Sequence, residues 1–232
     1  MLTTLLPGQE PLMRLHKLLT AMSTAAFLSG CSLSPVFNAG VDSLKYSFSD
    51  KSLHLSPEQI EKLPRPSIGG RLSEDTAEAL LYGYAEKDGH YWYSSSHEYL
   101  VTNHARLMRT SGLQYNLLYS SLINDALQNP ELLSGKTFSQ SWTIDVEPGH
   151  WYGIQVNSTL TPIGLQDIEG YSSPLFQVDE HISIPAMNWE GTNQFWFDPH
   201  SHSVVMTKQF IHPDYPPIAT RVIKPFKDEV GQ

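Results

Sequence analysis

Apolar and polar residues alternate with a period of two along most of the chain beyond residue 65. Segment 138–146 is a clear case, because one of its faces carries four large apolar side chains and one amide. These are Phe138, Gln140, Trp142, Ile144 and Val146. Since successive side chains of a β-strand point to opposite faces, the pattern predicts strands with one buried and one solvated face.

Further segments show the same alternation and predict a total of about ten strands. Segment 77–95 is expected to form a hairpin around Asp88-Gly89, and 98–110 two strands around Asn103-His104. After a turn at Pro148-Gly149, segment 151–160 places Tyr152 on its apolar face, with Ile154, Val156 and Leu160. The remaining strands are expected at 175–184, 193–198, 203–211 and 218–225.

Two short helices complete the prediction. In segment 55–64, Ser56 can cap a helix, Pro57 occupies its first position, and Gln59 completes a capping box. Two prolines at its end limit this helix to about two turns. A second short helix is expected within 120–133, ending near Pro130.

Many strands joined by short turns indicate a mainly β protein. We expect an antiparallel meander sheet curled into a barrel or half-barrel, with two or so short helices, because a sheet of about ten strands twists and curls. A parallel α/β fold is excluded, since no long helix alternates with the strands.

The first thirty residues have the pattern of a secretory signal peptide. A basic stretch beginning at Arg14 precedes the apolar or small run 18–28, which is too short to span a bilayer. Residues 1–12 do not fit this pattern, so the start is either Met1 or Met13. The string that ends in Gly30-Cys31 looks like the lipobox of a bacterial lipoprotein, and Cys31 is the only cysteine.

The lipobox resemblance implies cleavage between Gly30 and Cys31 and attachment of palmitate-type chains to Cys31. More than one chain is needed for stable anchoring, so Cys31 would hold the protein on a membrane. Ser32 at the second mature position favours the periplasmic face of the outer membrane over inner-membrane retention. The expected organisation is a signal peptide at 1–30, a lipidated tether at 31–53, one β domain at 54–227 and a tail at 228–232.

The charge of the chain excludes one class of partner. The formal net charge is −9, and no basic cluster is present. Nucleic acid is therefore not an expected partner, because its recognition requires a basic patch.

Candidate catalytic and metal-binding groups are few. His200 and His202 form an H-x-H pair, with His181 as a possible third ligand, but zinc requires three or four ligands, so no metal is assigned. A glycosidase would use two carboxylates, for which Asp145 with Glu147 and Asp179 with Glu180 are the candidates. None of these pairs has a spacing that specifies catalysis, so no catalytic residue and no cofactor is assigned.

Five tryptophans could stack on sugar rings, since an aromatic face offers apolar area beside a polar handle. Trp142 lies on the apolar face of its segment and is expected in the core. Trp151 lies on the polar face of 151–160 and is the candidate for a glycan contact.

Several strings between Leu55 and Pro225 are characteristic of one family. "FWFDPHSHSVVMTKQFIHPDYPPIATRVIKP" (195–225), together with "LSPEQIEKLP", "YGYAEKDGHYWYSS", "VTNHARLMRTSGL" and "DVEPGHWYGIQVNST", resembles the YjbF/GfcB (YmcC-like) lipoproteins of group 4 capsule and exopolysaccharide operons. Ala105 and His202 depart from it, since glycine is expected at both in hairpin turns. The resemblance implies a barrel-like periplasmic domain needed for surface polysaccharide production or export, without known catalytic residues.

The sequence therefore favours a lipoprotein that is not an enzyme. It would assist production, assembly or export of a capsular or exopolysaccharide by binding the glycan or a protein of the export machinery. Two alternatives remain open: a glycan-modifying enzyme, or a carrier that encloses a lipid or acyl chain in the curled sheet.

Overall fold

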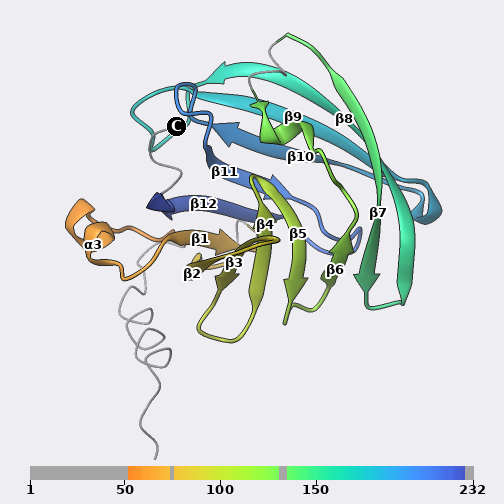
Figure 1. Ribbon diagram of the computed structural model, residues 1–232, viewed down its shortest axis with the longest axis horizontal. Helices are drawn as coiled ribbons and strands as arrows, with labels where there is room; N and C mark the ends of the chain where they lie inside the picture. The colour runs from red at the N-terminus through yellow and green to blue at the C-terminus, as the bar shows by residue number, and fades with distance from the viewer. Residues whose placement is uncertain (1–51, 74–75, 131–134, 228–232) are drawn as a thin grey trace, which may run out of the picture. The chain divides into compact units, whose positions relative to one another are not determined.

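The described part of the protein is built around one antiparallel sheet that curls until it nearly closes into a barrel (Figure 1). The computed structural model describes residues 52–73, 76–130 and 135–227. The sheet has twelve strands in the order β5-β4-β3-β2-β1-β12-β11-β10-β9-β8-β7-β6. Almost every strand lies beside its neighbour in sequence, as expected for a meander, and β1 pairs with β12 at the point where the chain begins and ends its path through the sheet.

The first half of the sheet contains short strands. They are β1 (Ser67–Arg71), β2 (Ala79–Glu86), β3 (Gly89–Tyr93), β4 (Tyr99–Asn103), β5 (Arg106–Ser111) and β6 (Asn116–Ser120). The second half contains most of the long ones. They are β7 (Phe138–Glu147), β8 (Trp151–Gln166), β9 (Leu175–Ile184), β10 (Trp189–Phe197), β11 (Val204–Gln209) and β12 (Ile218–Lys224).

The expected fold class is confirmed, but two strands have no counterpart in the sequence prediction. Strand β1 contains Gly69 and Gly70 and lacks apolar alternation, yet it is central, hydrogen-bonded to β2 and β12. Strand β6 is short, and a bulge between Leu117 and Tyr119 breaks its period of two. Both strands are defined by their neighbours rather than by their own sequence pattern.

The helix expected in segment 55–64 is confirmed as α3 (Pro57–Lys62). The Ser56 side chain accepts from the Gln59 amide, and the Gln59 side chain accepts from the Ser56 amide, so the capping box is complete. The second expected helix is wrong in kind, because only a 3₁₀ turn, η1 (Ala126–Gln128), forms before Pro130. A further turn, η3 (Pro185–Met187), separates β9 from β10.

The two edge strands of the sheet, β5 and β6, lie side by side where the barrel closes (Figure 1). Between β5 and β6, side-chain hydrogen bonds replace part of the regular ladder of backbone hydrogen bonds. The Thr110 hydroxyl accepts a hydrogen bond from the Leu117 amide at 2.9 Å and lies 3.4 Å from the Asn116 side-chain oxygen. This arrangement of β5 and β6 is called the seam below.

Apolar side chains from nearly all strands fill the interior of the barrel, and Val146, Leu160, Val178 and Phe195 have no exposed surface. The expected interior position of Tyr152 is wrong. Gly153 adopts φ 63° and interrupts the alternation at the start of β8, which leaves Tyr152 exposed. On the outer face, α3 and its flanks cover β1, β2 and β12 through Leu53, Leu63 and Leu80.

Turn geometry explains the two departures from the family pattern. His202 has φ 57°, a left-handed conformation that glycine adopts without strain. In the β4–β5 turn the left-handed residue is His104, with φ 51°, whereas Ala105 is buried against Phe195 and Leu127. Ala105 is therefore a core residue.

In the β2–β3 hairpin the two turn residues are Lys87 and Asp88, and Gly89 already belongs to β3.

Candidate functional site

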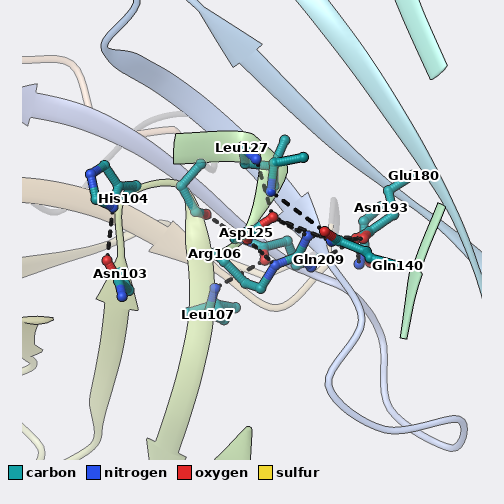
Figure 2. Close-up of polar contacts among 12 residues, drawn as sticks. Asn103, His104, Arg106, Leu107, Asp125, Leu127, Gln140, Glu180, Asn193 and Gln209 are labelled. Atoms are coloured by element: carbon teal, nitrogen blue, oxygen red, sulfur yellow. Dashed lines mark hydrogen bonds and ion pairs between the residues drawn. The ribbon is translucent and has the colours of Figure 1, made fainter. Parts of the chain in front are cut away.

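A network of polar side chains lies buried inside the barrel, with Arg106 at its centre (Figure 2). Arg106 stands at the start of β5 and forms ion pairs with Asp125, which caps η1, and with Glu180 on β9. Its Nη1 and Nη2 atoms donate to the two Glu180 oxygens at 2.8 and 2.9 Å. A two-pronged pair of this kind is the strongest form of arginine–carboxylate contact.

One cation stands against two carboxylates, so further donors are needed to satisfy the acidic oxygens. The Asn193 amide donates to Glu180 Oε2 at 2.9 Å, and the Gln140 amide approaches Asp125 Oδ1 at 3.3 Å. The Leu127 backbone amide donates to Asp125 Oδ1 at 3.1 Å. Strands β5, β7, β9 and β10 are thereby joined through the interior.

Two further contacts fix the position of Arg106. Gln209 on β11 accepts from the Leu107 amide at 3.0 Å and donates to the Ala105 carbonyl at 2.8 Å, so it holds the β5 backbone on both sides of Arg106. The guanidinium carbon lies 5.0 Å from the ring centre of Trp142 and 5.5 Å from that of Phe195. Both distances allow cation–π attraction.

Opposing effects set the charges of the network. Burial acts to raise the pKa of the Asp125 carboxyl, but the charge and hydrogen bonds of Arg106 outweigh burial and hold that pKa below its usual range. For Arg106, burial acts to lower the pKa, and the two carboxylates raise it instead. Asp125 and Arg106 therefore remain charged. Because Glu180 has no exposed surface, the network joins strands and does not meet a substrate.

A small cavity adjoins this network. It has about 40 Å³ of space for water-sized molecules and is lined by Arg106, Asn193 and Gln209 together with Ser120 and His212. The Ser120 Oγ and His212 Nε2 atoms are buried without a hydrogen-bond partner. The volume suits about two to four water molecules. It is too small to enclose an acyl chain, so this part of the interior gives no support to the carrier alternative.

The buried His212 predicts a loss of stability in mild acid. Burial lowers the pKa of its imidazole, and Asp214 opposes this shift only in part. The unfolded chain therefore takes up the proton at a higher pH than the folded protein, and stability falls as the pH drops below about 6.5. His212 contributes at most about 1.4 kcal/mol per pH unit to the slope of the free energy of unfolding against pH.

Urea unfolding between about pH 7 and pH 5 tests this slope. His212→Gln is expected to reduce it but not to abolish it, since burial also lowers the pKa of His90. His181→Gln is the matched control, because the His181 side chain is 57% exposed, and its slope should equal that of the wild type. Equal slopes in wild type and His212→Gln would refute the assignment.

A wide groove lies on the outer face of the sheet over β10, β11, β12 and β1. Strand pairing arranges its floor in two parallel rows of neighbouring residues. The first row runs Trp196, Met206 and Arg221, bordered by Gln177 and Gly69, and the second runs Gln194, Lys208, Ala219 and Arg71, bordered by Asp179. The groove has a volume of about 530 Å³.

The groove is hollow because small residues stand between long ones. Gly69 borders the floor beside Arg221, and Ala219 lies between Lys208 and Arg71. Glu78 lies across Gly69, so that a Cβ on Gly69 would be 2.1 Å from a carboxylate oxygen. Glu78 receives hydrogen bonds from Arg221 at 2.7 and 2.9 Å and from the Leu53 amide at 2.7 Å. The same carboxylate therefore borders the groove and holds the first described segment against the sheet.

The two candidate carboxylate pairs do not converge on one site. Asp179 and Glu180 are consecutive residues of β9, so Asp179 points outward and Glu180 into the network. Asp145 Oδ1 accepts from the Gly153 amide at 2.7 Å, and Glu147 Oε1 accepts from Asn116 at 3.1 Å. Each carboxylate of this second pair is occupied by a local hydrogen bond.

The histidine and tryptophan candidates are dispersed over the surface. His200 and His202 are exposed in the β10–β11 turn, where Asp198 caps the backbone, and His181 lies near Glu190. Across residues 52–73, 76–130 and 135–227, no three His, Cys, Asp or Glu side chains form a group that could hold a metal. Trp151 is 43% exposed at the start of β8, and Trp142 packs against the core.

Sequence reasoning did not find Arg106, Asp125, Asn193 and Gln209. A signal was nevertheless present for part of the network. Glu180 is in phase with the apolar residues Val178 and Ile182 of its strand, and Gln140 is in phase with Trp142 and Ile144. A polar residue on the apolar face of a strand indicates a buried partner.

The lipidation site Cys31, the cleavage position after Gly30 and nearly all of the tether lie outside the described residues. None of the helices in the described ranges combines the length and apolarity that crossing a bilayer requires.

The fold and the site define a nearly closed β-barrel with a buried polar network in its apolar interior and an open groove on its outer face. A family model described as "Group 4 capsule polysaccharide lipoprotein gfcB, YjbF" matches residues 34–223. The chain therefore belongs to the YjbF family of group 4 capsule polysaccharide lipoproteins, which confirms the resemblance noted in its sequence.

Two curated relatives and one solved structure support this assignment. The chain is 29% identical to the uncharacterized lipoprotein GfcB of Escherichia coli K12 over 210 residues, which cover 87% of this chain and 95% of GfcB. It is 24% identical to the uncharacterized lipoprotein YjbF of the same strain, covering 78% and 85% of the two chains. The crystal structure of the E. coli K12 hypothetical lipoprotein YmcC matches with a TM-score of 0.62 and 25% identity, covering 71% of this chain and 89% of that one.

Proposed function

We propose that this protein is an outer-membrane lipoprotein, anchored through Cys31 at the periplasmic face, that assists the export or assembly of a capsular polysaccharide without chemical catalysis. It acts by binding the glycan or a protein of the export machinery. The family membership supports the link to capsule polysaccharide, and the sequence around Cys31 supports the anchor.

One observation carries the non-catalytic part of the proposal. The carboxylates that lie close together, Asp125 and Glu180, are buried and neutralised by Arg106. A glycosidase needs two carboxyl groups that flank a bound sugar. The outward-facing carboxylates Asp145, Glu147 and Asp179 belong to different hydrogen-bonding environments, which supports a surface that binds rather than one that cleaves.

The test is complementation of a strain whose own copy of the gene is deleted. Deletion is expected to reduce cell-surface polysaccharide, and the triple variant Asp145→Asn, Glu147→Gln, Asp179→Asn is expected to restore it to the wild-type level. Surface polysaccharide is measured by immunoblot, and the amount of variant protein is checked in the same cells. A strong loss of polysaccharide at a normal protein level would favour the enzyme alternative.

Glu180 is left out of that variant because its replacement would disturb the fold. The outward residue Asp179 beside it is the informative one, since its side chain accepts hydrogen bonds from the amides of Gln177 and Gln194 at 2.6 and 3.5 Å.

A further inference from the structure

We propose that the outer groove over β10, β11, β12 and β1 binds an anionic oligosaccharide, with Trp196 stacking on a sugar ring and Arg71 and Lys208 contacting its carboxylates. This inference rests on the proposed function for the source of the glycan, but the groove itself is argued from its own geometry. Its volume of about 530 Å³ falls within the range of small-molecule sites.

Trp196 is held in a fixed orientation on the floor of the groove. Its indole Nε1 donates a hydrogen bond to Gln177 Oε1 at 3.1 Å, and Met206 is its neighbour on the other side. The ring is half-buried, so it gives up little freedom when a ligand binds. A fixed aromatic face next to amide side chains suits a sugar, which presents apolar C–H groups and hydroxyls together.

The charges of the groove favour an anion. Three cationic residues, Arg71, Lys208 and Arg221, line it together with one carboxylate, Glu78. Glu78 is already engaged by Arg221 at 2.7 Å and by the Leu53 amide. The groove is therefore locally positive on a chain whose formal net charge is −9. A positive groove attracts an anionic ligand, whereas the net negative charge of the chain disfavours binding of that ligand elsewhere on the surface.

The arrangement of these groups distinguishes a glycan from other anions. Arg71 and Lys208 stand at one row of the floor, and Trp196 stands in the other row, two residues from Gln194. One carboxylated sugar can place its ring over the indole and its carboxylate toward Lys208 on the neighbouring strand, and a later sugar of the same chain can reach Arg71, three strands from Trp196. An arginine side chain is suited to this contact because its planar donors match the two oxygens of a carboxylate.

The binding test uses the mature lipidated protein in detergent and isothermal titration with hexagalacturonate as the anionic probe. Wild type is expected to bind it saturably, with an affinity that falls as salt is raised. Maltohexaose, a neutral chain, should bind at least about tenfold more weakly because it lacks the carboxylates. Polyglutamate tests for an acidic peptide, and equal binding of polyglutamate would overturn the assignment to a glycan.

Variants then locate the site. Trp196→Ala is expected to weaken hexagalacturonate binding by about tenfold or more, as when a central aromatic contact is truncated. Trp151→Ala is the matched control, since Trp151 is an exposed tryptophan outside the groove, and it should bind as wild type does. Arg71→Glu and Ala219→Phe keep Trp196 in place but reverse a charge or fill the floor, and both should also lose binding.

Failure of this inference can be told apart from failure of the proposed function. If wild type does not bind hexagalacturonate, or if Trp196→Ala, Arg71→Glu and Ala219→Phe all bind normally, the groove assignment is wrong, even where deletion of the gene still reduces capsule. If Arg71→Glu abolishes binding yet fully restores capsule to the deletion strain, the groove assignment stands and its part in the proposed function is wrong.

Discussion

Replacing Arg106 with alanine is expected to lower the free energy of unfolding by about 3–5 kcal/mol, because it leaves two buried carboxylates without their cation. The loss is large beside the total stability of a single domain, which is about 5–15 kcal/mol. Neither Asp125 nor Glu180 can turn to water, since Glu180 has no exposed surface and Asp125 is buried at the start of η1. Urea or guanidinium unfolding measures the change.

Arg109→Ala is the matched control for Arg106. Arg109 lies on the same strand, but its side chain is 38% exposed and its nearest carboxylate, on Asp88, is 3.9 Å away. Its loss is expected to cost less than about 1 kcal/mol, as for other surface pairs. A variant that replaces Arg106 by methionine and both carboxylates by apolar residues should recover much of the stability. Similar losses in Arg106→Ala and Arg109→Ala would contradict the role given to the network.

Replacing Cys31 with serine is expected to move the protein from the membrane fraction to the soluble fraction. Lipid chains bind a membrane by burying methylene groups, at about 0.8 kcal/mol each, and two or more chains are needed for stable attachment. Serine has no thiol to carry them. The variant should therefore incorporate no labelled palmitate, and it should fail to restore capsule if anchoring is needed for function.

Ser34→Ala is the control for this experiment, since it changes the same segment and keeps the thiol. It is expected to incorporate palmitate and to sediment with membranes as wild type does. Recovery of palmitate on the Cys31→Ser protein would sink the lipidation proposal.

Most of the sheet can be predicted from the sequence because its strands follow the period-two rule. Segment 175–184 became β9 with the same bounds, and the capping box at Ser56 and Gln59 marked the start of α3 correctly. Strand β1 could not be predicted, since Gly69 and Gly70 carry no side-chain pattern and its position depends on pairing with β2 and with β12, the last strand of the chain.

The candidate site was less predictable for the same reason. Arg106 lies 19 residues from Asp125 and 74 from Glu180, and only barrel closure brings them together. A single sequence does not show directly which residues far apart in the chain come into contact. Likewise, the outer rows that place Trp196 beside Met206 follow from strand register, so the local pattern favoured Trp151, which stands on a polar face but outside the groove.

The seam affects whether neighbouring copies of the protein on one bilayer can pair their strands. A lipid-anchored protein is confined to two dimensions, where molecules meet far more often than in solution. An exposed strand edge would then invite a neighbouring copy to add its own strand. The Thr110 side chain accepts a hydrogen bond from a backbone amide of β6, and the Gln209 side chain accepts one from a backbone amide of β5, the two strands to which such an addition would be made. A strand from a neighbouring copy would therefore meet these two amides already hydrogen-bonded.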